Sequence, residues 1–131
     1  MNKENFMISR IYTSKNGETH FEDLEINLKQ ENNKPLESQL FHAEGIIFRK
    51  APNNQKRGWH LAPQKQLVVS LSGIATITTS DGEKREFGPG SILLVDDTEK
   101  YSKGHTTVVN KDTGERKTLF IPIDINEFNK L

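Results

Sequence analysis

Residues 58 to 73 have the sequence GWHLAPQKQLVVSLSG, in which a histidine precedes an apolar strand that ends in glycine. Successive side chains of a strand point to opposite faces, so His60 and Gln66 share a face if Pro63 keeps the register. The members of that face are His60, Ala62, Gln64, Gln66, Val68 and Ser70. Such a face either lines a cavity inside a barrel, where a small ligand or ion meets its polar side chains, or lies against solvent.

The strand-like period of two residues recurs along the chain, and no segment carries the apolar stripe of a helix. Strands are predicted at residues 7–13, 19–28, 44–50, 66–71, 74–79, 84–87, 91–95, 105–110 and 118–123. Asn16-Gly17 and Asp81-Gly82 supply the positive φ of tight hairpin turns, while the polar segments 29–39 and 51–58 predict loops. Four consecutive apolar residues at 92–95 indicate a strand that is covered on both faces. The pattern as a whole predicts an all-β barrel or a two-sheet sandwich.

The composition excludes several classes of function. The 131 residues correspond to one domain, and 18 basic residues cancel 18 acidic ones. No run of Lys and Arg exceeds two residues, so nucleic acid is not an expected partner. No apolar stretch is long enough for a secretory signal or a membrane span, and the absence of cysteine fits a reducing compartment. We therefore expect a soluble cytoplasmic protein with no membrane partner.

Residues 58 to 73 resemble the first motif of the cupin superfamily, whose members are small double-stranded β-helix or jelly-roll barrels. In that motif two alternating histidines are followed by a glutamate and a closing glycine. His60 stands at the position of the first histidine, Ala62 at the second, Gln66 at the glutamate and Gly73 at the glycine. The resemblance implies that the all-β fold is a cupin barrel.

Residues 90 to 110 resemble the second cupin motif, in which a glycine begins a strand and a turn leads to a histidine and then to an asparagine. Gly90, His105 and Asn110 stand at these positions. The resemblance covers nearly the whole chain and is to a bacterial subgroup of single-domain, RmlC-like cupins, most of which have no assigned activity. It implies one cupin domain, with N-terminal strands and a loop at 1–43, the barrel core at 44–123 and a C-terminal tail at 124–131.

The resemblance also implies a metal site, and this chain departs from it. The usual cupin site takes three histidines and one glutamate, whereas here only His60, His105 and the neutral oxygen of Gln66 remain. Two imidazoles would need a carboxylate from elsewhere to complete a common ferrous-iron arrangement. The candidates are Glu44, Asp96 and Asp97. We expect either a divalent metal ion at His60, His105 and Gln66, or an ordered water or small anion beside the imidazoles.

The predicted ligand-binding residues are His60, Gln66, His105, Gln64 and Tyr101. Gln64 belongs by strand alternation, and Tyr101 because its hydroxyl group could cap the mouth of the barrel ahead of the SKGH turn. The Asp96-Asp97 pair is expected to hydrogen-bond to backbone amides in a turn. No residue is assigned as catalytic.

The preferred function is a small-molecule-binding cupin with a degenerate metal site in the barrel interior. Two alternatives remain: a metal-free isomerase or lyase that uses histidine as general acid or base, and a binding module without catalysis. A homodimer is expected as well, because the N-terminal strands can pair with another sheet edge and because LVVSL (67–71) is also apolar on its outer face. Related small cupins are commonly dimers.

Overall fold

The computed structural model describes residues 5–123, and within them every regular element is a β-strand. The strand bounds are β1 Phe6–Thr13, β2 Thr19–Ile26, β3 Ile47–Ala51, β4 Lys56–His60, β5 Gln66–Ser72, β6 Ala75–Thr79, β7 Lys84–Phe87, β8 Ile92–Asp96, β9 His105–Val109 and β10 Arg116–Pro122. No helix that could cross a membrane occurs in this part of the chain. The predicted tail at 124–131 lies outside the described residues.

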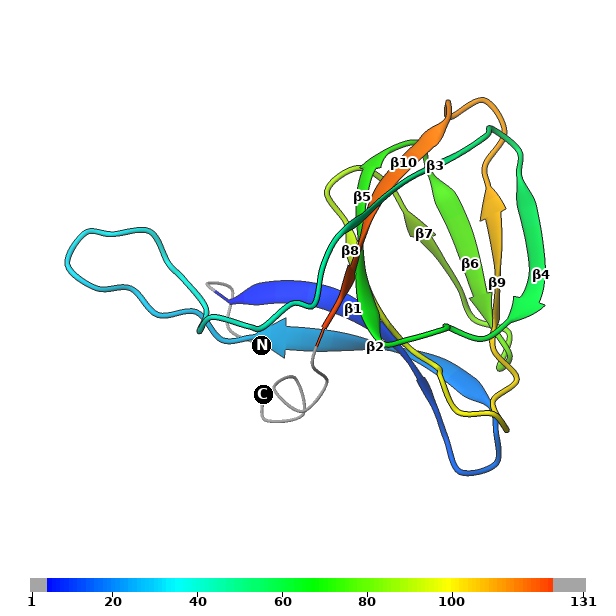
Figure 1. Ribbon diagram of the computed structural model, residues 1–131, viewed down its shortest axis with the longest axis horizontal. Coiled ribbons are helices and arrows are strands. Elements are labelled where there is room, and N and C mark those ends of the chain that lie inside the picture. Colours follow the sequence, from blue (N-terminus) through cyan, green and yellow to red (C-terminus); the bar gives the residue numbers. More distant parts are fainter. Residues whose placement is uncertain (1–4, 124–131) are drawn as a thin grey trace.

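The strands form two facing sheets (Figure 1). One sheet has six strands in the order β2-β1-β8-β5-β10-β3, and the other has four in the order β4-β9-β6-β7. From β3 to β10 the chain changes sheet at every step except the β6–β7 hairpin, which is the winding of a jelly roll. The predicted all-β double-stranded β-helix, or jelly-roll, fold is confirmed.

The two predicted hairpins are present. β1 pairs with β2 across Gly17, and β6 pairs with β7 across Gly82. Both glycines have positive φ, +88° and +92°, a conformation in which a Cβ would be strained. The first hairpin extends the six-stranded sheet, because β1 also runs parallel to β8.

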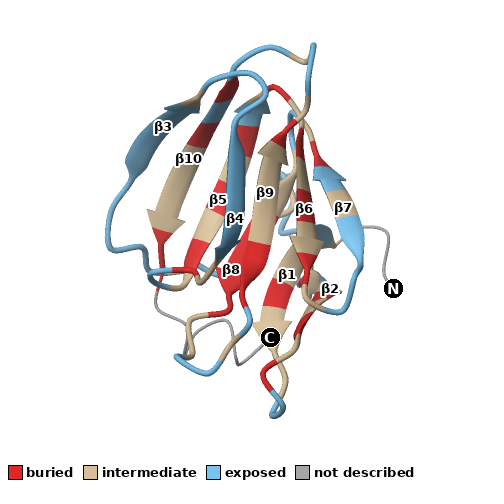
Figure 2. Cartoon of the chain, turned by 90° about the vertical axis from the view of Figure 1, so that its right-hand side faces the viewer, coloured by how far each residue is buried: buried red, intermediate tan, exposed pale blue. Residues whose placement is uncertain are grey.

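β8 is covered on both faces, as the ILLV run predicts. Leu93 and Val95 belong to the hydrophobic cluster between the sheets, which also includes Ile77. Leu94 points the other way, into a second cluster with Ile8. β8 is mostly buried, whereas the residues of β3 and β4 are mostly exposed, as Figure 2 shows.

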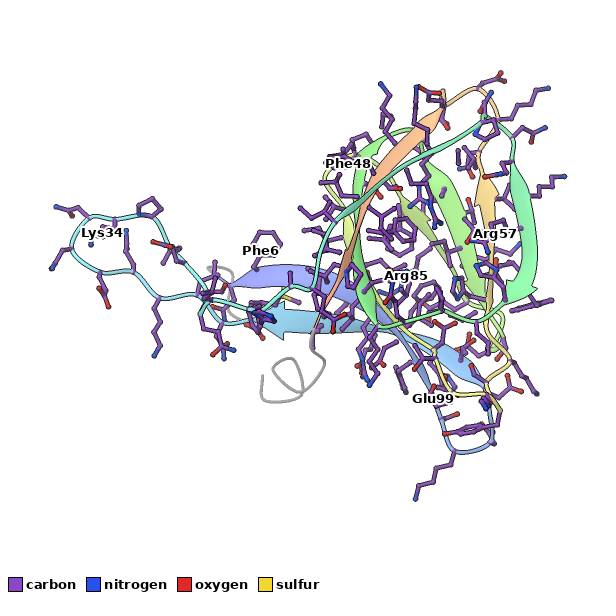
Figure 3. All side chains as sticks on the ribbon, in the orientation of Figure 1. Phe6, Lys34, Phe48, Arg57, Arg85 and Glu99 are labelled. Atoms are coloured by element: carbon purple, nitrogen blue, oxygen red, sulfur yellow. The ribbon has the colours of Figure 1, made fainter. Side chains whose placement is uncertain are left out.

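Two predictions in the middle of the chain are wrong. The predicted strand at 44–50 begins only at Ile47, and the predicted loop at 51–58 contains the start of β4. The sequence of β4, KRGWH, lacks apolar alternation because the strand is at a sheet edge and largely exposed. The segment between β2 and β3 forms an arm that extends away from the barrel, with Lys34 at its tip (Figures 1 and 3).

Candidate functional site

A cavity of about 140 Å³ lies between the two sheets. Its apolar wall includes Val68, Ile77, Leu93, Val95, Val109 and Phe120. Its polar lining includes His60, Gln66, His105, Thr107, Thr118 and three arginines. Of the two possibilities for the polar face of the opening stretch, the cavity therefore applies to His60 and Gln66.

His60 and His105 face each other at one end of the cavity. They are partners in the antiparallel register of β4 and β9, and their ring centroids are 4.4 Å apart with the planes tilted by 58°. The register of β4 shifts between Arg57 and His60. Residues three apart on a regular strand point to opposite faces, and this irregularity lets the side chains of both Arg57 and His60 reach the cavity.

Gly104 makes the close approach of the two histidines possible. Its φ is +73°, and a Cβ built on it would lie 2.3 Å from the backbone oxygen of His60. The Thr19 hydroxyl donates a 2.7 Å hydrogen bond to the Gly104 carbonyl and so ties this turn to β2. A side chain at position 104 would push β4 away from β9.

Hydrogen bonds fix the orientation of both imidazoles. Nδ1 of His105 lies 2.5 Å from Oδ2 of Asp97, whose side chain is fully buried. Nδ1 of His60 donates a 2.7 Å bond to the Gly58 carbonyl, because a carbonyl can only accept. Both rings are therefore held as Nδ1–H tautomers when neutral, and each has an Nε2 lone pair left for a ligand.

Burial lowers the pKa of His60 below its usual value, and the nearby charges of His105 and Arg57 act in the same direction. The hydrogen bond to Gly58 opposes this shift. His60 is consequently neutral near neutral pH and serves as an acceptor at Nε2.

Gln66 and Ala62 line the same cavity as the two histidines. Gln66 is only 2% exposed, and its Oε1 has no hydrogen-bond partner among the described residues. Ala62 occupies little of the space available there, and its N–H donates to the backbone oxygen of Asp97. The site thus offers a buried acceptor that has no protein donor.

Two predicted ligand-binding residues lie elsewhere. Gln64 is exposed and does not line the cavity, because the strand alternation is interrupted between β4 and β5, at Pro63. Tyr101 is 60% exposed in the loop before β9, and its backbone lies against Gly17 of the first hairpin. Neither residue lines the cavity.

Asp96 and Asp97 are adjacent in the sequence but contact different side chains. Asp97 orients His105, whereas Asp96 forms ion pairs with Arg10 and Lys65. The sequence did not predict the contact of Asp97 with His105, because it joins the end of β8 to the start of β9 across a turn. Strand parity says nothing about such a contact.

Three arginines that were not predicted as site residues also line the cavity: Arg49, Arg57 and Arg116. The alternation of Arg116, Thr118 and Phe120 on β10 was an available signal, because all three share a face.

The residues present fit a divalent cation poorly. Two imidazoles and one neutral amide carry no negative charge, and the described residues contain no group of three His, Cys, Asp or Glu side chains that could hold a metal ion. Three guanidinium groups line the same cavity. Since like charges repel, they oppose the entry of a cation. The metal ion at His60, His105 and Gln66 remains a prediction.

Solved cupin structures are similar to this chain. An RmlC-like cupin family protein with a double-stranded β-helix fold from Methanocaldococcus jannaschii has a TM-score of 0.48 and 12% identity, covering 80% of this chain and 95% of its own. A cupin domain from Bordetella pertussis has a TM-score of 0.46 and 16% identity, and the match covers 76% of this chain and 91% of that domain. A cupin superfamily protein from Desulfitobacterium hafniense has a TM-score of 0.45 and 19% identity, and the match covers 74% of this chain and 97% of that protein. No protein-family model and no curated protein matches the sequence.

Proposed function

We propose that this cupin-like jelly roll binds a small molecule in the cavity between its sheets. The observation that supports the proposal most directly is the presence of His60, His105 and Gln66 in the lining of one cavity. Two imidazole rings with centroids 4.4 Å apart and a buried Oε1 without a protein donor line one cavity together with an apolar wall. A few convergent polar groups in an otherwise apolar concavity are typical of ligand sites.

The size of the cavity limits the ligand. A cavity of roughly 150 Å³ can accept a molecule as large as benzene, and the cavity here has about 140 Å³. The ligand, or the part of it that enters the barrel, therefore has about six non-hydrogen atoms in a compact or flat arrangement.

The experiment is a fragment screen by NMR with anionic, cationic and neutral compounds of this size. The side-chain resonances of His60 and His105 report binding. We expect a subset of fragments to shift both, and we expect Ala62→Phe, which fills the cavity, to abolish the shifts. Gln64→Phe is the matched control, because residue 64 is exposed and outside the cavity.

His60→Ala serves as a second variant in case Ala62→Phe does not fold, and it should weaken the binding of the same fragments. The proposal is wrong if no fragment shifts either histidine. It is equally wrong if the fragments that bind wild type bind both variants with unchanged affinity.

One contact supports a second candidate, metal-free acid–base catalysis. The buried Asp97 carboxylate holds His105 by Nδ1 and would stabilise the imidazolium that forms when Nε2 accepts a proton. An isomerase or lyase of this kind would exchange a carbon-bound proton of its ligand with solvent. Deuterium incorporation into a bound fragment in D₂O, lost in His105→Gln, would support it, whereas binding without incorporation supports a non-catalytic module. Nickel and zinc titrations of wild type and His60→Ala test the predicted metal separately.

A further inference from the structure

Three arginines approach the cavity from three different strands: Arg49 of β3, Arg57 of β4 and Arg116 of β10. In the β10–β3 register, Thr118 pairs with Arg49 and Arg116 pairs with Ala51. Arg49 and Arg116 are therefore diagonal neighbours on the inner face of one sheet. Arg57, the partner of Thr107, approaches from the other sheet (Figure 3).

No acidic side chain balances these charges. The cavity lining contains no Asp or Glu within residues 5–123, and no described carboxylate forms an ion pair with Arg49, Arg57 or Arg116. Elsewhere in the protein the arginines are paired: Arg10 contacts Glu22 and Asp96, and Arg85 contacts Asp23 and Glu83. The lack of partners is therefore particular to the cavity and not a general feature of the chain.

Arg116 is the most deeply placed of the three. It is only 7% exposed, its Nη2 donates to Ser70 Oγ at 3.3 Å, and its Nε has no partner in the described structure. Burial lowers the pKa of Arg116 to about 10, and the charge of Arg49 contributes to the shift. Buried guanidinium groups are normally paired, because an unpaired buried charge is costly.

The other two guanidinium groups lie where a ligand would enter. Arg49 and Arg57 are both exposed residues that line the cavity, and the Arg49 guanidinium lies over the Phe120 ring, 3.9 Å from its centroid. The planar donors of arginine match the oxygens of carboxylates and phosphates. The remaining wall is apolar, which suits a carbon skeleton and not a bare inorganic ion.

We propose that the ligand is a small organic anion, whose charged oxygens bind the guanidinium groups of Arg49, Arg57 and Arg116 while its apolar body packs against Val68 and Ile77. This inference rests on the proposed function, since it names the chemical class of the molecule that the cavity takes. Nε2 of the neutral His60 and Oε1 of Gln66 accept hydrogen bonds, so the preferred anion also carries a hydroxyl or amide donor.

The test compares three molecules of nearly the same shape by isothermal titration calorimetry in low salt: benzoate, neutral benzamide and cationic benzamidine. We expect benzoate to bind about tenfold more tightly than benzamide, which corresponds to one charge-assisted hydrogen bond, and benzamidine to bind more weakly still. Phenyl phosphate and inorganic phosphate, added as two further titrants, show whether the head is carboxylate or phosphate and whether the apolar body is needed.

Variants then assign the effect to the cavity. Arg57→Gln should reduce benzoate affinity about tenfold, and Lys56→Gln, which removes the same charge from the neighbouring exposed residue, should leave it unchanged. Arg49→Gln is the second cavity variant, in case Arg57→Gln disturbs the edge strand β4. The salt dependence of benzoate binding should decrease in both cavity variants.

Three results would overturn the inference. The first is that benzamide or benzamidine binds as tightly as benzoate or more tightly. The second is that neither benzoate nor phenyl phosphate binds at a concentration of about 10 mM. The third is that Lys56→Gln lowers benzoate affinity as much as Arg57→Gln does. None of these results refutes the proposal that the cavity binds a small molecule. That proposal is tested separately by the fragment screen, which also includes neutral and cationic compounds. Loss of all binding in that screen would refute both.

Discussion

Replacing Gly104 by alanine should destabilise the protein more than replacing other glycines of positive φ. Position 104 has a φ of +73°, and its Cβ would lie 2.3 Å from the His60 oxygen, more than 1 Å short of the 3.4 Å at which ordinary contacts begin. The left-handed conformation costs alanine about 1–2 kcal/mol. Forcing β4 away from β9 adds about 1–3 kcal/mol, the usual cost of overpacking.

Gly82→Ala is the matched control. Its φ is +92°, and nothing lies within 4 Å of a Cβ built there, so only the conformational cost of about 1–2 kcal/mol applies. The difference between the two variants isolates the contact with His60, because the change in side chain and in the unfolded chain is the same. We expect this difference to be about 1–3 kcal/mol in the free energy of unfolding.

Urea denaturation followed by far-ultraviolet circular dichroism measures both free energies. Fluorescence of Trp59, the single tryptophan, adds a local probe next to His60. Gly104→Ala should change the native Trp59 spectrum and weaken benzoate binding, whereas Gly82→Ala should change neither. Equal destabilisation by the two substitutions would refute the argument that Gly104 sets the distance between β4 and β9.

Three further predictions concern the histidines and the surface. Asp97→Ala should lower the free energy of unfolding by about 1–3 kcal/mol, because it leaves the buried Nδ1–H of His105 without an acceptor; thermal unfolding of Asp97→Asn, which keeps an acceptor, should show a smaller loss. Because the pKa of His60 is lowered in the folded state, the unfolded chain binds its proton more readily. Stability should therefore fall as the pH drops from about 6.5 through the folded-state pKa, and the urea midpoint of His60→Gln should show a smaller decrease over that range. We also propose that the chain is a homodimer, since Leu40 is 95% and Phe48 81% exposed; sedimentation at micromolar concentration should give twice the mass of one chain, and Phe48→Ser should shift it toward the monomer.

Alternation predicted the part of the site that lies within one strand. Gln66, Val68 and Ser70 are buried on the inner face of β5, as a period of two requires. Gln64 does not follow this alternation from His60, because the residues between β4 and β5, which include Pro63, do not form a strand. Strand parity is reliable only while the ladder of hydrogen bonds continues.

The charged part of the site could not be predicted in this way. Arg49 and Arg116 are far apart in the sequence and become neighbours only through the register of β3 and β10. Arg57 lies in a segment whose sequence predicts a loop. The net charge of the whole chain is zero, so it gives no indication that positive charge in the cavity is not balanced by acidic side chains.

The unpaired arginines connect the stability of the fold with the proposed function. A buried guanidinium without a carboxylate disfavours the folded state, so a chain that needed only stability would have an apolar residue at position 116. An anion that binds only the folded protein offsets this cost in proportion to the logarithm of its concentration above Kd. The thermal midpoint should therefore respond more strongly to benzoate than to benzamide. The same charges oppose a divalent cation, because like charges repel. The neutral side chains of Ala62 and Gln66 in the cavity lining add no negative charge, so the lining as a whole favours a ligand of negative charge.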